Sequence, residues 1–381
     1  MKRTLLFVFG TRPEAIKMAP LVLAARASAD FRAVVVVTGQ HRAILDEVLA
    51  TFGITPDHDL NLLRARQTLT HVTTSVLEGL EPILATEAPA AVIVQGDTTT
   101  TFAAGLAAFY QRIPVVHVEA GLRSGDTFSP YPEEANRRMT SQFASLHLCP
   151  TAGAAANLIG EGVDPAIVSV TGNTVIDALQ HVVAAPTRRL DPTIASFIGN
   201  QRVVLITSHR RESWNAGLAQ VAAAIARTAR EHPDWRIVFP MHPNPIVHEQ
   251  MRPHLEQVPN VLLVDPQPYP AFCALLARAD VVLTDSGGVQ EEAPSLGKPV
   301  LVTRENTERP EAVESGAALL IGTDEDRVYT ELTALLDDPE HYAAMANAIS
   351  PYGDGHAAER SLAALRYLFD GAAKPADFQA V

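Results

Sequence analysis

Short apolar runs recur along this chain, and each is followed by a turn and a longer amphipathic stretch. In the first half the apolar runs lack polar alternation, which is typical of strands buried on both faces of a parallel sheet. The amphipathic stretches between them predict helices. The strands predicted for this half are residues 5–9, 33–38, 91–95, 115–118, 146–149 and 167–170.

The pattern restarts after a predicted helix at 174–183 and a connector that contains proline and arginine. The new strands are predicted at 203–206, 236–239, 261–264, 281–283, 300–302 and 319–321. Alternation of strands and helices predicts doubly wound α/β domains. We place one Rossmann-like domain at residues 1–172 and a second at 173–356, and we expect a last helix, 357–370, to pack back on the first domain.

Composition narrows the class of protein. The 381 residues are 47% hydrophobic, enough for the cores of two domains, and the formal net charge of -13 argues against a general nucleic-acid binder. Cys149 and Cys273 lie far apart, and neither they nor the histidines have metal-ligand spacing, so we expect reduced cysteines, no metal site and a cytoplasmic enzyme. The apolar run after Arg3 is too short for a signal peptide, and no run approaches the length of a membrane span.

Polar residues follow the predicted strands, where open parallel sheets bind their ligands. The first strand runs into Gly-Thr-Arg-Pro-Glu at residues 10–14, with Lys17 one turn further on. Arg12 and Lys17 would therefore lie at a helix N-terminus, a suitable place for a phosphate. The local alternative is a capped helix with two solvated cations. The dinucleotide pattern G-x-G-x-x-G is missing from the sequence.

Three carboxylates of the first half follow strands or open a helix: Asp97, Glu119 and Glu133. Carboxylates gathered at one edge of a sheet raise one another's pKa, so that one of them can hold a proton near neutral pH. General acid–base catalysis requires a group that can hold and release a proton near neutral pH. The structural alternatives are that Asp97 caps a helix and that Glu133, with Glu134, complements a helix dipole.

The second half supplies groups that suit an anion. Ser286, Gly287 and Gly288 follow a predicted strand at the start of a helix and would present N–H groups to a diphosphate. Glu292 lies one helical turn later, in a position to accept hydrogen bonds from ribose hydroxyls. A lone Ser-Gly-Gly is usually only a turn, but the strand before it and the acidic residues after it favour a nucleotide site.

Seven motifs, taken in order, resemble those of bacterial non-hydrolysing UDP-N-acetylglucosamine (UDP-GlcNAc) 2-epimerases. They are GTRPEAIK at 10–17, GDTTT at 96–100, HVEAGLR at 117–123, PEEANR at 132–137, HRRE at 209–212, TDSGGVQEEAP at 284–294 and TERPE at 307–311. The resemblance runs from about residue 5 to Gly355. It implies a GT-B-type fold, in which two Rossmann-like domains with doubly wound parallel sheets face a central cleft, and it implies a homodimer.

The resemblance also implies an activity, the reversible epimerisation of UDP-GlcNAc to UDP-N-acetylmannosamine (UDP-ManNAc) without a cofactor, for cell-surface polysaccharide biosynthesis. UDP would leave and return through a 2-acetamidoglucal intermediate. The catalytic residues would be Asp97, Glu119, Glu133 and His209. The substrate-binding residues would be Arg12, Lys17, Gln267, Phe272, Ser286, Gly287, Gly288, Glu292 and Arg309. A second, activating UDP-GlcNAc would contact Gln40, His41, Arg66 and His242, although Ala43 stands where activated members carry a glutamine.

The chemistry of the substrate supports elimination independently. The C2 proton of N-acetylglucosamine is not acidic, because no carbonyl adjoins C2, so epimerisation needs either transient oxidation by a nicotinamide or loss and return of UDP at C1. Phosphate-holding turns and several carboxylates favour the second route. Three alternatives remain: a hydrolysing 2-epimerase that releases ManNAc and UDP, a GT-B glycosyltransferase, and a sugar-nucleotide sensor without turnover.

Overall fold

The structure is a computed structural model that describes residues 2–380 apart from 40–41, 63–66, 186–188 and 211–216. The chain divides into two compact units. Unit 1 comprises Met1–Ala178 and Tyr352–Gln379, and unit 2 comprises Leu179–Pro351 and Ala380–Val381. The chain therefore leaves unit 1 inside helix α7 (Thr174–Ala184) and returns to it at Tyr352.

Unit 1 is built on a seven-stranded parallel sheet with the order β3-β2-β1-β4-β5-β6-β7. Its strands are β1 (Arg3–Phe9), β2 (Phe31–Val37), β3 (His58–Asp59), β4 (Ala91–Gln95), β5 (Val115–Val118), β6 (Leu146–Cys149) and β7 (Val168–Val170). Every residue of β4 to β7 is buried, which explains the missing polar alternation. The two-residue β3 was not predicted, because it carries no apolar run.

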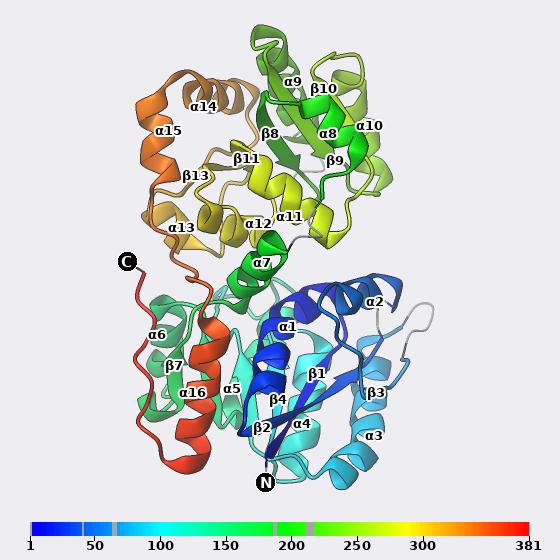
Figure 1. Cartoon of the computed structure of the whole chain (residues 1–381), viewed down its shortest axis with the longest axis vertical. Helices are drawn as coiled ribbons and strands as arrows, with labels where there is room; N and C mark the ends of the chain where they lie inside the picture. Colours follow the sequence, from blue (N-terminus) through cyan, green and yellow to red (C-terminus); the bar gives the residue numbers. More distant parts are fainter. Residues whose placement is uncertain (1, 40–41, 63–66, 186–188, 211–216, 381) are drawn as a thin grey trace. The chain divides into compact units, whose positions relative to one another are not determined.

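Helices cover both faces of this sheet (Figure 1). The helices of unit 1 are α1 (Arg12–Ala27), α2 (Arg42–Thr51), α3 (Leu69–Glu87), α4 (Thr99–Tyr110), α5 (Glu133–Phe143), α6 (Ala152–Gly160) and α16 (Ala357–Asp370), together with the 3-10 turn η1 (Pro165–Ile167) and the first residues of α7. Apolar residues of α3 and α4, among them Val76, Leu80 and Ala104, pack on strand residues such as Leu6 and Val92. Helix α16, the last of the chain, packs against α1, so the two ends of the sequence meet in unit 1.

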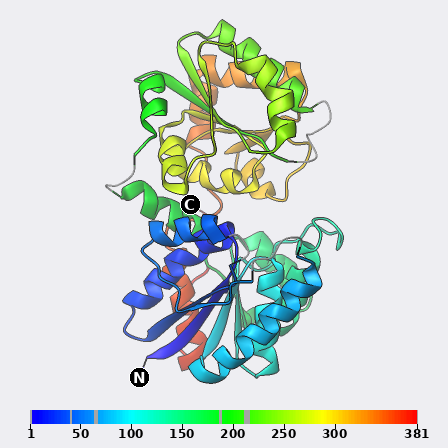
Figure 2. The ribbon, with the colours of Figure 1, turned by 90° about the vertical axis from the view of Figure 1, so that its right-hand side faces the viewer.

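Unit 2 has a six-stranded parallel sheet with the order β10-β9-β8-β11-β12-β13, drawn between its helices in Figure 2. The strands are β8 (Arg202–Thr207), β9 (Trp235–Pro240), β10 (Val261–Val264), β11 (Val281–Thr284), β12 (Val300–Val302) and β13 (Ala318–Leu320). The helices are α8 (Pro192–Ile198), α9 (Gly217–Glu231), α10 (Pro245–Leu255), α11 (Tyr269–Arg278), α12 (Gly287–Glu292), the 3-10 turn η3 (Pro294–Leu296), α13 (Pro310–Glu314), α14 (Glu325–Asp337) and α15 (Pro339–Ala346).

The strand order of each sheet reverses direction at one point, between β1 and β4 in unit 1 and between β8 and β11 in unit 2. Doubly wound sheets bind ligands beyond the carboxyl ends of the strands at this switch. The predicted fold class, two doubly wound parallel-sheet domains, is therefore confirmed. Of the helices in the described part of the chain, none combines the length and the apolarity that are needed to cross a bilayer.

Candidate active site

A buried glutamate joins the two turns at the switch point of unit 1. Oε2 of Glu14 accepts hydrogen bonds from the backbone N–H groups of Gly10 (3.0 Å) and Thr11 (2.7 Å). Its Oε1 accepts from the hydroxyls of Thr98 (2.6 Å) and Thr101 (3.2 Å). Burial raises the pKa of Glu14, and these hydrogen bonds only partly oppose the effect. We had not assigned Glu14 a role, although Thr11 and Glu14 form the Thr-x-x-Glu capping box that identifies it.

Glu119 follows β5 and adopts φ 58°, a left-handed backbone conformation that is unusual for a residue other than glycine. Its carboxylate contacts the ammonium of Lys17 and accepts a hydrogen bond from the amide of Gln95. The amide of Asn173 donates a further hydrogen bond of 3.0 Å to Oε1. The residue is only 8% exposed. Groups from α1, from β4 and from the segment after β7 therefore hold one nearly buried carboxylate.

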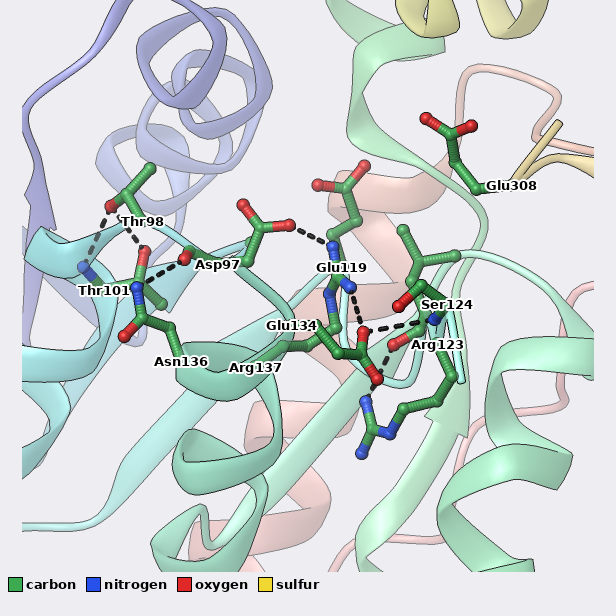
Figure 3. A network of polar contacts seen from close by, with 12 residues as sticks. Asp97, Thr98, Thr101, Glu119, Arg123, Ser124, Glu134, Asn136, Arg137 and Glu308 are labelled. Carbon is green, nitrogen blue, oxygen red and sulfur yellow. Dashed lines mark hydrogen bonds and ion pairs between the residues drawn. The ribbon is translucent and has the colours of Figure 1, made fainter. Parts of the chain in front are cut away.

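Asp97 lies beside Glu119, because Gln95 and Val118, the last residues of the neighbouring strands, are register partners. The guanidinium of Arg137 forms an ion pair with Asp97, and the two side chains point toward one another in Figure 3. The N-cap of α4 is Thr98, so the alternative in which Asp97 caps the helix is wrong.

Helix α5 carries both the partner of Asp97 and the third candidate carboxylate. Glu134, fully buried, accepts from Arg137 (2.8 Å) and from the backbone N–H of Ser124 (3.1 Å), as Figure 3 shows. Glu133 is half-buried at the first position of α5, four residues before Arg137 and hence on the same helix face. The structure thus brings Asp97 and Glu119 to neighbouring strand ends and Glu133 to the helix whose arginine reaches Asp97.

The environment of these carboxylates differs from our expectation. We predicted mutual repulsion among Asp97, Glu119 and Glu133, but a cation lies against two of them, Arg137 against Asp97 and Lys17 against Glu119. A cation in direct contact with a carboxylate offsets the repulsion that neighbouring carboxylates exert on it. The contact between Lys17 and a phosphate stays a prediction, as does that of Arg12, which is half-buried at the first turn of α1.

A buried histidine supports the turn that carries Asp97. Nε2 of His117, in β5, lies 2.7 Å from the carbonyl oxygen of Gly96. Burial lowers the pKa of His117 to about 4, so the ring is neutral at pH 7 and Nε2–H donates to that carbonyl. Its neighbour His147, in β6, is also buried, and its pKa falls to about 3. Neither histidine supplies a charge to the site, and sequence reasoning had not assigned them a role.

In unit 2 a buried aspartate orients His209. Oδ2 of Asp285, which follows β11, accepts from the backbone N–H groups of His209 (2.8 Å) and Arg210 (2.9 Å). Its Oδ1 lies 3.0 Å from Nδ1 of His209. Burial acts to raise the pKa of Asp285, but the interactions with His209 and Arg210 outweigh it, and the pKa is lowered. The ring of His209 stacks on that of His242, with centroids 5.7 Å apart.

The glycine turn of unit 2 lies beneath an arginine. Ser286 is the N-cap of α12, and a Cβ placed on Gly287 would come within 2.5 Å of Nη1 of Arg309. Glu291 (2.7 Å) and Glu308 (3.2 Å) hold that guanidinium in place. A guanidinium beside the start of a helix suits an anion such as a phosphate, because the guanidinium and the helix N-terminus both attract negative charge. Only glycine, which has no Cβ, leaves room for the guanidinium at residue 287.

The other predicted binding residues of unit 2 lie around α11 and α12. Oε1 of Glu292, a buried residue, accepts from the hydroxyl of Tyr269 at 3.3 Å. Gln267 precedes α11 and lines a cavity of about 330 Å³ together with His248 and Arg252 of α10. Phe272 is half-buried in the first turn of α11.

Three predicted residues, Gln40, His41 and Arg66, lie outside the described residues. Within the part of the chain that the structure describes, no three side chains of His, Cys, Asp or Glu are grouped in a way that fits a metal ion. Cys149 and Cys273 are buried and carry no disulfide, and burial raises the pKa of Cys149.

Comparisons with known proteins agree with one another. Residues 23–366 match a protein-family model described as UDP-N-acetylglucosamine 2-epimerase. A UDP-N-acetylglucosamine 2-epimerase of Escherichia coli (strain K12) is 53% identical over 367 residues, which cover 95% of this chain and 98% of that protein.

Solved structures give the same result. The UDP-GlcNAc 2-epimerase from Neisseria meningitidis, bound to UDP-GlcNAc, matches with TM-score 0.86 and 44% identity over 95% of this chain and 99% of that one. The S. aureus MnaA–UDP structure matches with TM-score 0.89 and 43% identity over 99% and 100%.

Proposed function

The chain belongs to the family of UDP-N-acetylglucosamine 2-epimerases, and we propose that it is a non-hydrolysing member, an isomerase that interconverts UDP-GlcNAc and UDP-ManNAc. The observation that carries the proposal is the group of carboxylates at and beside the switch point of unit 1. Asp97 and Glu119 lie at neighbouring strand ends, and Glu133 lies on the helix whose Arg137 contacts Asp97. Inversion at C2 needs proton carriers on both faces of the sugar, which a single carboxylate does not supply.

The reaction is proposed to run in two halves. A carboxylate takes the proton from C2 while the C1–O bond breaks, and the electron pair of that bond leaves with UDP, so that 2-acetamidoglucal forms. UDP then adds back to C1 while another acidic group gives a proton to C2 on the opposite face. Asp97, Glu119 and Glu133 are the proposed proton carriers. A general acid or base must lie within hydrogen-bond reach of the proton that moves, so the proposal requires the C2 atom of the sugar to bind next to these carboxylates.

Unit 2 is proposed to hold UDP and to stabilise the charge that develops on it. Asp285 fixes the ring of His209, and Arg309 lies over the glycine turn. Removal of one such donor commonly raises a barrier by about 3 kcal/mol. Arg12 and Lys17 of α1 are proposed to contact the diphosphate as well. The residues proposed to bind UDP in unit 2 are Gln267, Phe272, Ser286, Gly287, Gly288, Glu292 and Arg309.

The resemblance supports further proposals. These are a homodimer in the cytoplasm, a supply of ManNAc units for a cell-surface polysaccharide, and activation by a second UDP-GlcNAc. The activating molecule would contact Gln40, His41, Arg66 and His242. Stacking of His242 on His209 is consistent with a link between the two ligands, because the two rings lie in contact.

Incubation with UDP-GlcNAc in D2O, followed by NMR, tests the proposal. We expect UDP-ManNAc that carries deuterium at C2, because the proton returned to C2 comes from a group that exchanges with the solvent. Free ManNAc would identify a hydrolysing enzyme instead. Unchanged UDP-GlcNAc with protium at C2 would leave a glycosyltransferase or a sensor as the better account.

A further inference from the structure

Asn173 lies between two segments of unit 1, the one in which the chain leaves the unit (α7) and the one in which it returns (from Tyr352). We call these two the crossing segments. It is buried, with 2% of its surface exposed, and it directly precedes α7, the helix in which the chain leaves. Its backbone N–H donates a 2.7 Å hydrogen bond to the carbonyl of Tyr352, the residue at which the chain returns. Its side chain also contacts Glu119.

Two hydrogen bonds fix the orientation of the Asn173 amide. Oδ1 accepts from the backbone N–H of Val175 (3.1 Å) and so satisfies a donor at the start of α7. With the oxygen used in this way, Nδ2 faces Glu119 and donates to its Oε1 (3.0 Å). The two ends of one amide therefore have separate roles, one in the helix and one at the carboxylate.

The segments around Asn173 are bound together. A Cβ on Gly172, which has φ +83°, would lie 3.4 Å from the Cα of Gly353, so the two crossing segments pack closely. One turn into α7, Asp177 accepts from the backbone N–H groups of Ala357 (3.2 Å) and Ala358 (2.8 Å) at the start of α16. Asn173 thus has a rigid support, which a positioning group needs.

We propose that Asn173 is a positioning residue for the reaction, which holds Oε1 of Glu119 in place and stabilises its ionised form. This inference rests on the proposed function, in which Glu119 carries a proton. A residue with φ 58° keeps its place only if its surroundings hold it, and the Asn173 amide is one of the groups that do so. A donor to a carboxylate also favours the charged form over the neutral one.

Other charged and titratable groups near Glu119 must be separated from this effect. Lys17 of α1 pairs with Glu119, and Asp97, after β4, pairs with Arg137 of α5. His117 of β5 interacts with Glu119 but is neutral, since burial lowers its pKa to about 4. All of these groups are unchanged in a variant at residue 173, so a change in the pH profile of such a variant reports on the contact between residues 173 and 119.

Two variants separate the roles of the amide. Asn173→Asp keeps the oxygen that accepts from Val175 but replaces the donor with a second anion beside Glu119, which raises the pKa of Glu119. Asn173→Ala removes both hydrogen bonds. The control is Asn260→Ala in unit 2, which removes a buried amide that donates to the carbonyls of Ala229 (2.8 Å) and His232 (3.0 Å), far from either crossing segment in the sequence.

We expect kcat for UDP-GlcNAc epimerisation to fall roughly 10- to 100-fold in both Asn173 variants, with KM changed by less than about threefold, because a small misplacement acts on the reaction step. In Asn173→Asp the acidic limb of the kcat profile shifts to higher pH, and activity recovers partly there. Asn260→Ala lowers thermal stability and activity only in proportion to the folded fraction.

The inference is overturned if folded Asn173→Asp keeps the wild-type kcat and pH profile. It is also overturned if both variants lose activity only in step with the folded fraction, as the control does. Failure of the proposed function is a separate result, since the wild-type chain itself would then show no epimerisation.

Discussion

The two units place different chemistry at the same position of the same kind of fold. In unit 1 the ends of β4, at the switch point, and of its neighbour β5 carry carboxylates, and a cation lies against each of Asp97 and Glu119. In unit 2 the ends of the two strands at the switch point, β8 and β11, carry His209 with Asp285, and the glycine turn that starts at Ser286. Strand order therefore decides where polar groups gather, whereas the side chains decide which role we propose for each unit, proton transfer in unit 1 and anion binding in unit 2.

Two buried carboxylates, one in each unit, have pKa shifts of opposite direction although burial acts to raise both pKa values. Burial raises the pKa of Asp177 in unit 1 to about 6, because backbone N–H groups only partly offset it. For Asp285 in unit 2, burial is outweighed by His209 and the backbone N–H groups that it meets, and the pKa is lowered. The partners of a buried carboxylate, rather than its burial alone, set the direction of the shift.

The largest effect is expected from loss of a carboxylate in unit 1. Asp97→Asn and Glu119→Gln should each lower kcat about 10²- to 10⁴-fold, the usual contribution of a general acid or base. UDP affinity, measured by calorimetry, should stay within about threefold, because the proposed UDP contacts lie mainly in unit 2. Glu231→Gln, on the surface of unit 2, is the control and should change little. If these variants lost UDP binding but kept turnover, the proposed division of roles between the two units would be wrong.

The next effect concerns stability in unit 1. The folded state binds a proton at Asp177 between its ordinary pKa of 3.8 and about 6, so stability falls as the pH rises through this window. The shift corresponds to about 3 kcal/mol. Asn in place of Asp177 cannot ionise, so its stability lacks this pH dependence. The Tm of Asp177→Asn minus the Tm of the wild type should therefore increase by roughly 5–10 °C from pH 4 to pH 7. A Tm difference that does not vary with pH contradicts the account.

An intermediate effect is expected at the glycine turn of unit 2. Gly287→Ala places a methyl group against Arg309, so the guanidinium must move. Loss of charge-assisted hydrogen bonds to a phosphate should weaken UDP binding about 10- to 100-fold in calorimetry. Gly160→Ala, at the end of α6 with no atom within 4 Å of the added carbon, is the matched control and should bind UDP as the wild type does. Equal affinities of both variants would remove the assignment.

The smallest effect is expected at Asp285. Asp285→Asn keeps one oxygen to accept from the backbone N–H of His209 but loses the charge beside the ring. We expect kcat to fall about tenfold, in line with the loss of one hydrogen bond to a charged group. A kcat equal to that of the wild type, measured on folded protein at pH 7, would show that the orientation of His209 does not matter.

Much of the fold was predictable because it depends on local pattern. The strands of both sheets are uninterrupted apolar runs, and Asp97, Glu119 and Ser286 were found because they directly follow or lie near the ends of such runs. The strand β3 was missed because two polar residues carry no pattern.

The contacts within the site were not predictable, because they join distant parts of the chain. Lys17 and Glu119 are 102 residues apart, and His209 and Asp285 are 76 apart. The contact between Lys17 and Glu119 depends on β1 lying near β5, and the contact between His209 and Asp285 depends on β8 lying beside β11. Hydrophobic periodicity does not give this strand order. Asn173 illustrates the limit, since its contact with Glu119 follows only once β7 and the returning segment are placed.

Cleavage and re-formation of the C1–O bond is the central claim of this account, and isotope exchange tests it most directly. UDP-GlcNAc labelled with oxygen-18 in the bridge between C1 and the β-phosphorus would be incubated with the wild-type chain and recovered before equilibrium. If UDP leaves and returns, the label spreads to non-bridging oxygens of the β-phosphate in the recovered sugar nucleotides. Complete retention of the label in the bridge, in UDP-ManNAc that the enzyme has formed, would contradict elimination.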